Sequence, residues 1–226
     1  MIYFKQLFAI LFLISFSFIG CQSQDSTISF LALGDSYTIG ESVGVENSWP
    51  VQLSEQLRAK GLDVADPKVI AQTGWTTQDL KKAIAEADLN PPYDFVSLLI
   101  GVNDQYQGID ISKYPSNFSF LAEKAISLAG DKPHNVFILS IPDYGVTPFG
   151  QQKNPKKIAT ELARYNAINK KIADSLGIHY INITPISKKA KTNPDLVASD
   201  GLHPSAKMYN QWVKKVAPVV LDEFGK

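Results

Sequence analysis

LALGDSYTIGESVG, residues 31–44, is the stretch that decides the fold of this chain. It continues an apolar run, Ile28–Leu33, of the kind that forms a strand buried on both faces of a parallel sheet. Two serines follow the run, and each is a candidate nucleophile: Ser36 stands in Gly-Asp-Ser, and Ser42 stands in the pattern G-x-S-x-G. Their positions relative to the strand decide between them.

Strand-like and helix-like segments alternate from here to the end of the chain. The expected strands cover residues 28–33, 69–71, 95–100, 135–141 and 178–183. The expected helices cover residues 48–60, a segment opening at 76–79, part of 117–128, residues 158–176, and a last helix starting near Pro204. This alternation predicts an α/β fold. Five strands joined by right-handed crossovers predict one three-layer, flavodoxin-like domain with a five-stranded parallel sheet, over residues 28–226.

The first twenty residues have the composition of a signal peptide. One positive charge, Lys5, precedes the apolar run Leu7–Ile19, which is short for a membrane span. The run ends in Phe18-Ile19-Gly20-Cys21, which resembles a bacterial lipoprotein box with Phe18 where leucine is usual. We expect a signal peptide over residues 1–20, a lipidated Cys21, a tether over 21–27, and a lipid-anchored location in the bacterial cell envelope, facing the periplasm or the surface. A plain secretory signal with an incidental cysteine, or an uncleaved anchor, is the alternative.

Composition excludes several classes of protein. The chain has 226 residues, with 22 basic and 22 acidic side chains. This balance lacks the basic excess of a nucleic-acid-binding protein. A single cysteine excludes an intrachain disulfide and a cysteine-based metal cluster. We expect neither a metal nor another cofactor.

The position of each serine favours Ser36 as the nucleophile. In open parallel sheets, reactive groups collect beyond the carboxyl ends of the strands. Ser36 is three residues past Leu33, whereas Ser42 is nine residues past it, in a loop that reaches no helix until about Ser48. The nucleophile elbow of α/β-hydrolases needs its serine on a sharp turn from strand to helix. Ser42 lacks both neighbours, so an elbow-type hydrolase using Ser42 remains only as a rival interpretation.

The histidines offer one suitable base. His134 and His179 precede the fourth and fifth expected strands, at the amino edge of the sheet. His203 instead follows Asp200 by three residues, in a loop that leads into the last helix. One turn can therefore hold the carboxylate against the imidazole, where it would orient the ring and stabilise its protonated form.

Two further strand ends offer hydrogen-bond donors for an oxyanion. Asn103 follows the third strand in Gly-Val-Asn-Asp, and Gly74 follows the second in Gln-Thr-Gly-Trp. The Asn103 amide could donate directly, and Gly74 would let a substrate approach a bare backbone N–H. Each residue alone could equally be an ordinary turn residue.

Gly34-Asp35-Ser36, Gly74, Gly101-x-Asn103-Asp104 and Asp200-x-x-His203, in this order and spacing, resemble the four blocks of the SGNH (GDSL-type) hydrolases. Tyr37 replaces the leucine of the strict GDSL string, and the second block consists of one glycine only. The family is a flavodoxin-like group of esterases and acyl hydrolases that need no cofactor. The resemblance implies that Ser36 is the nucleophile, His203 the base and Asp200 the orienting acid. It also implies an oxyanion hole made by the N–H groups of Ser36 and Gly74 and by the Asn103 side chain.

The expected function is hydrolysis of carboxylic esters through an acyl-serine intermediate, on a small-molecule, carbohydrate or lipid ester. An acyltransferase that hands the acyl group to a sugar would use the same residues, and a non-enzymatic envelope lipoprotein could keep the fold for binding alone. Five aromatic residues near the expected strand ends could line a substrate pocket or could only pack: Tyr37, Trp75, Tyr106, Tyr144 and Phe149.

Overall fold

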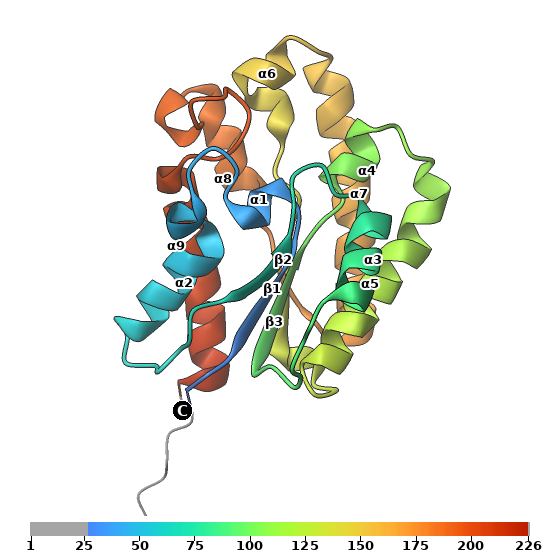
Figure 1. Cartoon of the computed structure of the whole chain (residues 1–226). Helices are drawn as coiled ribbons and strands as arrows, with labels where there is room; N and C mark the ends of the chain where they lie inside the picture. Colours follow the sequence, from blue (N-terminus) through green and yellow to red (C-terminus); the bar gives the residue numbers. More distant parts are fainter. Residues whose placement is uncertain (1–26, 226) are drawn as a thin grey trace, which may run out of the picture.

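The computed structural model describes residues 27–225 and contains one parallel sheet between two layers of helices (Figure 1). The strands lie in the order β2-β1-β3-β4-β5. Their bounds are Phe30–Gly34 for β1, Lys68–Ala71 for β2, Phe95–Leu99 for β3, Val136–Leu139 for β4 and His179–Ile181 for β5. This is the five-stranded, flavodoxin-like order, so the predicted fold class is confirmed. The predicted signal peptide, Cys21 and most of the tether lie outside the described residues.

The apolar runs form the centre of the sheet. Every residue of β1, β3 and β4 is buried, whereas the edge strands β2 and β5 are only partly buried. Gly34 pairs with Ala71 on one side and with Leu99 on the other, so β1, β2 and β3 end level with one another. The loops that follow these three strands therefore meet at one edge.

Helices cover both faces of the sheet. Helices α2 (Trp49–Arg58) and α9 (Ala206–Phe224) pack together on one face. On the other face lie α3 (Thr77–Glu86), α5 (Tyr114–Leu128) and α7 (Pro155–Leu176), as Figure 1 shows. Each main helix includes or overlaps a segment that the sequence predicts, and the Thr76–Asp79 capping box at the start of α3 is present.

Short helices occupy several segments in which the sequence predicts no helix: α1 (Ser36–Ile39), α4 (Val102–Tyr106), α6 (Pro148–Gln151) and α8 (Thr184–Ser187). Four or five residues are too few to show helical periodicity, so the sequence pattern could not reveal them. The last helix, expected to start near Pro204, begins two residues later as α9 at Ala206. Ser205 caps α9 by accepting a hydrogen bond from the Met208 N–H at 3.3 Å.

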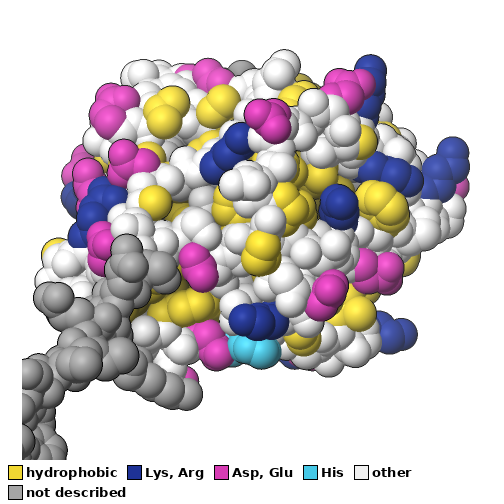
Figure 2. Space-filling model, turned by 60° about the horizontal axis from the view of Figure 1, so that its bottom comes forward, with side chains coloured by type: hydrophobic (Ala, Val, Ile, Leu, Met, Phe, Trp, Pro, Cys, Tyr) yellow, Lys and Arg dark blue, Asp and Glu magenta, His cyan; other side chains and the backbone are white. Residues whose placement is uncertain are grey.

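Two of the three histidines lie at the amino edge of the sheet, at the starts of β4 and β5. His134 and His179 both lie within 4 Å of Glu223, at 3.8 and 3.7 Å, which agrees with their expected place away from the carboxyl edge. On the molecular face that Figure 2 brings forward, acidic and basic side chains are interspersed. None of the helices described between residues 27 and 225 has the length and apolar character that crossing a membrane would require.

Candidate active site

Ser36 stands on the turn that joins β1 directly to α1. The strand ends at Gly34 and the helix begins at Ser36, with Asp35 as the capping residue, whose carboxylate accepts the Tyr37 N–H at 3.0 Å. A Cβ on Gly34 would lie 2.2 Å from the Thr38 hydroxyl oxygen, so the turn can close this tightly only at a glycine. Ser36, and not Ser42, therefore has the strand-to-helix position that exposes a nucleophile above a sheet.

Asp200 and His203 form a local pair, as their spacing predicts. The imidazole Nδ1 lies 2.5 Å from Oδ2 of Asp200. The other carboxylate oxygen, Oδ1, accepts the backbone N–H groups of Leu202 and His203 at 2.9 and 3.0 Å. Because Nδ1 is engaged by the carboxylate, the neutral ring carries its proton there and leaves Nε2 as the acceptor.

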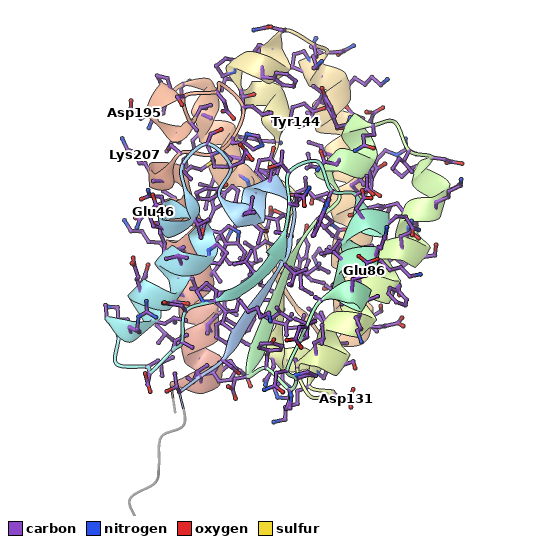
Figure 3. All side chains as sticks on the ribbon, in the orientation of Figure 1. Glu46, Glu86, Asp131, Tyr144, Asp195 and Lys207 are labelled. Carbon is purple, nitrogen blue, oxygen red and sulfur yellow. The ribbon has the colours of Figure 1, made fainter. Side chains whose placement is uncertain are left out.

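Hydrogen bonds and an ion pair join the two ends of the loop that carries this pair. The Ala198 N–H donates to the His203 carbonyl at 2.8 Å, and Val197 forms a bridge with Pro204. Asp195 and Lys207, labelled in Figure 3, form an ion pair at 2.9 Å that joins the loop to the first turn of α9. These contacts hold Asp200 and His203 in one conformation.

The two carboxyl groups flanking the site have opposite pKa shifts. Burial alone would raise the pKa of Asp200, but the hydrogen bonds it accepts, that from His203 first among them, lower it to about 2. Complete burial raises the pKa of Asp35 to about 8, only partly offset by its hydrogen bond from Tyr37. Asp200 is therefore ionised at neutral pH, whereas Asp35 is mostly protonated.

Three groups face the site as possible oxyanion donors. The Asn103 amide donates one hydrogen to the Trp75 carbonyl at 3.0 Å, which fixes its orientation and leaves its second hydrogen. Gly74 has φ of +84° and open space where a Cβ would be, so its backbone conformation, rather than crowding, calls for glycine. The Ser36 N–H lies in the first turn of α1, where backbone N–H groups have no partner within the helix.

A cavity of about 340 Å³ brings these residues together. Ser36, Gly74, Asn103 and His203 all line it. Of the five aromatic residues noted in the sequence, four line the cavity, namely Tyr37, Tyr106, Tyr144 and Phe149, whereas Trp75 does not. The aromatic residues therefore both line a pocket and pack, because Tyr37 and Tyr144 are also buried in the core.

Ser42 does not line this cavity, but its hydroxyl donates to Oδ2 of Asp200 at 2.7 Å. Sequence reasoning missed this contact, since the two residues are 158 positions apart and no motif links them. It also missed the role of Asp104, whose buried carboxylate accepts the Thr77 N–H at 2.9 Å and the Thr77 hydroxyl at 2.6 Å. Asp104 thereby fixes the start of α3 behind the loop that carries Gly74.

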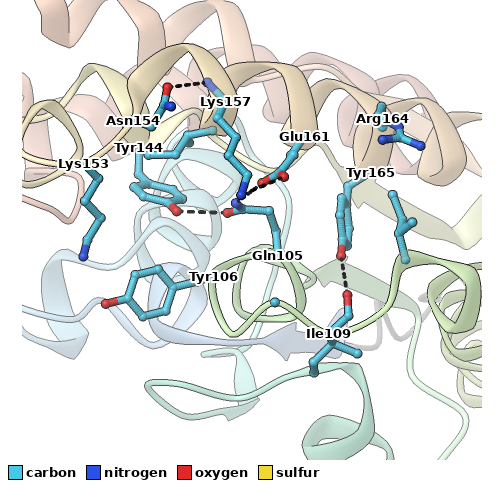
Figure 4. A pocket seen from close by; sticks show the side chains of 13 residues that line it. Gln105, Tyr106, Ile109, Tyr144, Lys153, Asn154, Lys157, Glu161, Arg164 and Tyr165 are labelled. Atoms are coloured by element: carbon cyan, nitrogen blue, oxygen red, sulfur yellow. Dashed lines mark hydrogen bonds and ion pairs between the residues drawn. The ribbon is translucent and has the colours of Figure 1, made fainter.

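A second, larger hollow of about 660 Å³ adjoins the first and shares Tyr106 and Tyr144 with it (Figure 4). Tyr144 donates to the Gln105 side chain at 3.0 Å, and Gln105 donates to Glu161 at 2.7 Å. Residues 157–165, in the first half of α7, form one wall of this larger hollow. Within residues 27–225, no group of three or more His, Cys, Asp or Glu side chains is placed to hold a metal ion.

Comparison with known proteins finds proteins of similar sequence and of similar fold. An arylesterase of Vibrio mimicus is 29% identical over 200 residues, which cover 86% of this chain and 88% of that protein. The acetyl xylan esterase AlAXEase has the same fold, with a TM-score of 0.68 and 20% identity over 85% of this chain and all of that one. A lipase/acylhydrolase from Enterococcus faecalis gives a TM-score of 0.66 and 18% identity, covering 87% of this chain and 96% of that one.

The family model described as GDSL-like lipase/acylhydrolase matches residues 32–211, which include every residue of the site described above. The chain belongs to the GDSL-like lipase/acylhydrolase family, whose members are esterases and acyl hydrolases.

Proposed function

We propose that this esterase-family protein hydrolyses carboxylic esters through an acyl-enzyme formed on Ser36. The observation that supports this proposal best is the Asp200–His203 pair at 2.5 Å, whose imidazole lines the same cavity as Ser36. A serine hydroxyl becomes a useful nucleophile only when a base can take its proton. His203 has its Nε2 available for that task.

In the proposed reaction, His203 Nε2 takes the Ser36 proton while Oγ bonds to the ester carbonyl carbon. The carbonyl oxygen becomes an oxyanion that accepts hydrogen bonds from the Ser36 and Gly74 N–H groups and from the Asn103 amide. When the intermediate collapses, the bond to the alcohol oxygen breaks, and that oxygen receives the proton from His203. Water then gives a proton to His203 and bonds to the acyl carbon. The bond between that carbon and Oγ breaks, Oγ takes the proton back from His203, and the acid is released.

The size of the cavity supports a short acyl group or a small aryl ester. About 340 Å³ is near the lower end of the range for ligand pockets. Apolar side chains form much of its lining, with Tyr37, Val102 and Leu202 among them. The names of the arylesterase relative and the acetyl xylan esterase neighbour agree with such a substrate.

The test is hydrolysis of p-nitrophenyl acetate, butyrate and octanoate by the mature protein and by the Ser36→Ala variant. We expect Ser36→Ala to abolish turnover while the folded state is kept, and the acetate or butyrate to be preferred. A Ser36→Ala variant with near-normal turnover would sink the proposal. Product analysis with a sugar present separates hydrolysis from acyl transfer, since a transferase would yield acylated sugar instead of free acid. If the protein neither turns over esters nor reacts with a fluorophosphonate probe, the result favours the alternative of a non-enzymatic lipoprotein that keeps the fold for binding.

We also propose that Cys21 is lipidated and anchors the enzyme to the cell envelope. The support is the apolar run ending in Phe18-Ile19-Gly20-Cys21. In a bacterial host fed a labelled fatty acid, the full chain should incorporate label and fractionate with membranes, and Cys21→Ala should do neither. If both forms fractionate with membranes and neither carries label, the segment is an uncleaved anchor. If both forms are released from the membrane without label, it is a plain secretory signal.

A further inference from the structure

The carboxylate of Asp200 has a second side-chain partner besides His203. Its Oδ2 lies 2.5 Å from His203 Nδ1 and accepts the Ser42 hydroxyl at 2.7 Å. The two donors therefore share one oxygen, while backbone N–H groups hold the other. Four donors on one carboxylate leave it little freedom to rotate away from the imidazole.

Ser42 adopts a backbone conformation that costs free energy. Its φ is +66°, a value that is uncommon for residues other than glycine. Such outliers persist where the surrounding structure enforces them, and they concentrate at functional sites. The loop is held on both sides of Ser42. The Glu41 N–H donates to the Ser36 carbonyl at 3.1 Å and the Glu41 carboxylate accepts a hydrogen bond from the Thr73 hydroxyl, while the Val43 N–H donates to the Gly40 carbonyl at 3.2 Å. Ser42 is thus presented to Asp200 by a loop that is anchored beside the nucleophile.

We propose that Ser42 is a positioning residue for the reaction: its hydroxyl locks the Asp200 carboxylate in the orientation that holds His203 as the base. This inference rests on the proposed function of Ser36, Asp200 and His203. The G-x-S-x-G stretch would then serve catalysis through its serine, but as a donor to the acid rather than as the nucleophile.

The decisive variant is Ser42→Gly, because it removes the side chain with its hydroxyl and glycine adopts positive φ freely. Ser42→Ala is its companion. Ser199→Ala is the matched control, since it removes a hydroxyl next to Asp200 for which the structure gives no hydrogen bond to that carboxylate. We expect both Ser42 variants to lose about tenfold in kcat, which corresponds to about 1.4 kcal/mol, with little change in KM. The Ser199→Ala control should change neither kcat nor KM.

The outcomes separate this inference from the proposed function. A Ser42→Gly variant with unchanged kcat and KM, beside an inactive Ser36→Ala, overturns the positioning role alone. A Ser42→Gly variant that raises KM and leaves kcat unchanged also overturns it, because a lock on Asp200 acts on the base and not on substrate binding. If fluorophosphonate labels Ser36→Ala but not Ser42→Gly, Ser42 is the nucleophile and both proposals fail.

A different observation concerns the larger hollow beside the catalytic cavity. Its wall carries the cationic residues Lys153, Lys157 and Arg164 against one acidic residue, Glu161. Lys157 lies 3.7 Å from Glu161, which also accepts the Gln105 amide. Among residues 27–225, neither Lys153 nor Arg164 forms an ion pair, so the hollow has an excess of positive charge.

Lys153 stands where the two hollows meet. Its ammonium group lies 4.8 Å from the ring centre of Phe149 and 5.5 Å from that of Tyr106, and both rings line the catalytic cavity (Figure 4 shows Lys153 and Tyr106). A substrate whose ester group lies at Ser36 and which extends past Tyr106 would bring its far end to this charge. We also infer that the larger hollow binds an anionic group, such as a carboxylate, on the part of the ester remote from the reacting bond. This inference likewise rests on the proposed site.

Two pairs of esters, each with one anionic and one neutral member, test the inference. The first pair carries the charge on the alcohol side of the ester bond, and the second pair carries it on the acyl side. The first pair is 4-acetoxybenzoate and its methyl ester, and the second is the 4-nitrophenyl monoester of adipic acid and 4-nitrophenyl hexanoate. We expect a higher kcat/KM for the anionic member of at least one pair. Lys153→Met should lower kcat/KM for the anionic member more than for the neutral member and so remove that preference, and Lys156→Met, a lysine on α7 outside the hollow, should keep it. A neutral preference in both pairs, or equal effects of the two lysine variants, overturns the inference, whereas loss of all activity in Ser36→Ala concerns only the proposed nucleophile.

Discussion

At the scale of single residues, Asn103 has one amide hydrogen committed to the Trp75 carbonyl, and its second hydrogen is the one that the proposed mechanism assigns to the oxyanion. We expect Asn103→Ala to lower kcat by about 10²- to 10³-fold, the usual cost of removing one oxyanion donor. Steady-state hydrolysis of p-nitrophenyl acetate measures this loss, and the thermal midpoint shows whether the fold is kept. Near-normal turnover would remove Asn103 from the oxyanion hole.

Asp35 makes stability depend on pH in an unusual direction. Burial raises its pKa to about 8, so between about pH 4 and 8 the folded protein holds a proton that the unfolded chain has lost. The free energy of unfolding should therefore fall as pH rises through this window, by up to about 1.4 kcal/mol per pH unit from this group. In Asp35→Asn this contribution should vanish, because asparagine does not titrate and its side-chain oxygen can still accept the Tyr37 N–H.

Urea denaturation of both proteins at pH 5, 6.5 and 8 measures the difference in slope. Asp174→Asn, which changes an exposed carboxylate on α7, is the control and should leave the slope as it is. Identical slopes for the native chain and Asp35→Asn would mean that Asp35 is ionised in the folded state.

At the scale of elements, the start of α3 is joined to α4 through the buried pair of Thr77 and Asp104. Thr77→Val keeps the side-chain shape but removes the 2.6 Å hydrogen bond to a buried carboxylate. We expect a loss of about 1–3 kcal/mol in the free energy of unfolding, the cost of leaving one buried polar group without its partner. Thr160→Val, at an exposed position on α7, should cost much less, and equal losses in the two variants would count against this role for Asp104.

At the scale of the whole molecule, the helical layer formed by α2 and α9 packs against the segment that carries Ser36. Trp212 of α9 is fully buried, with its ring centre 6.4 Å from that of Tyr37, the neighbour of Ser36. We expect Trp212→Ala to lower the free energy of unfolding by about 3–5 kcal/mol through the cavity it leaves. Denaturant titration measures the loss, and the exposed Lys214→Ala on the same helix should stay within about 0.5 kcal/mol of the native chain. A small loss for Trp212→Ala would mean that the layers can collapse around the gap.

The sequence alone determined the α/β class, the five strands and the main helices, because apolar periodicity and capping are local properties of the chain. It also singled out Asp200 and His203 as a pair, since three residues of one loop suffice to bring them together. The short helix α1 escaped prediction, because four residues carry no periodic signal.

Only the tertiary structure decided which residue Ser42 contacts. Its hydroxyl meets Asp200 across 158 positions of sequence, and no local pattern encodes a contact between loops that different strands carry to one edge. The same holds for the larger hollow, where α4 and α7 come together around Gln105 and Glu161. Local structure follows from neighbours along the chain, whereas the contacts that surround the site depend on the order and register of the strands, which burial of the whole core settles.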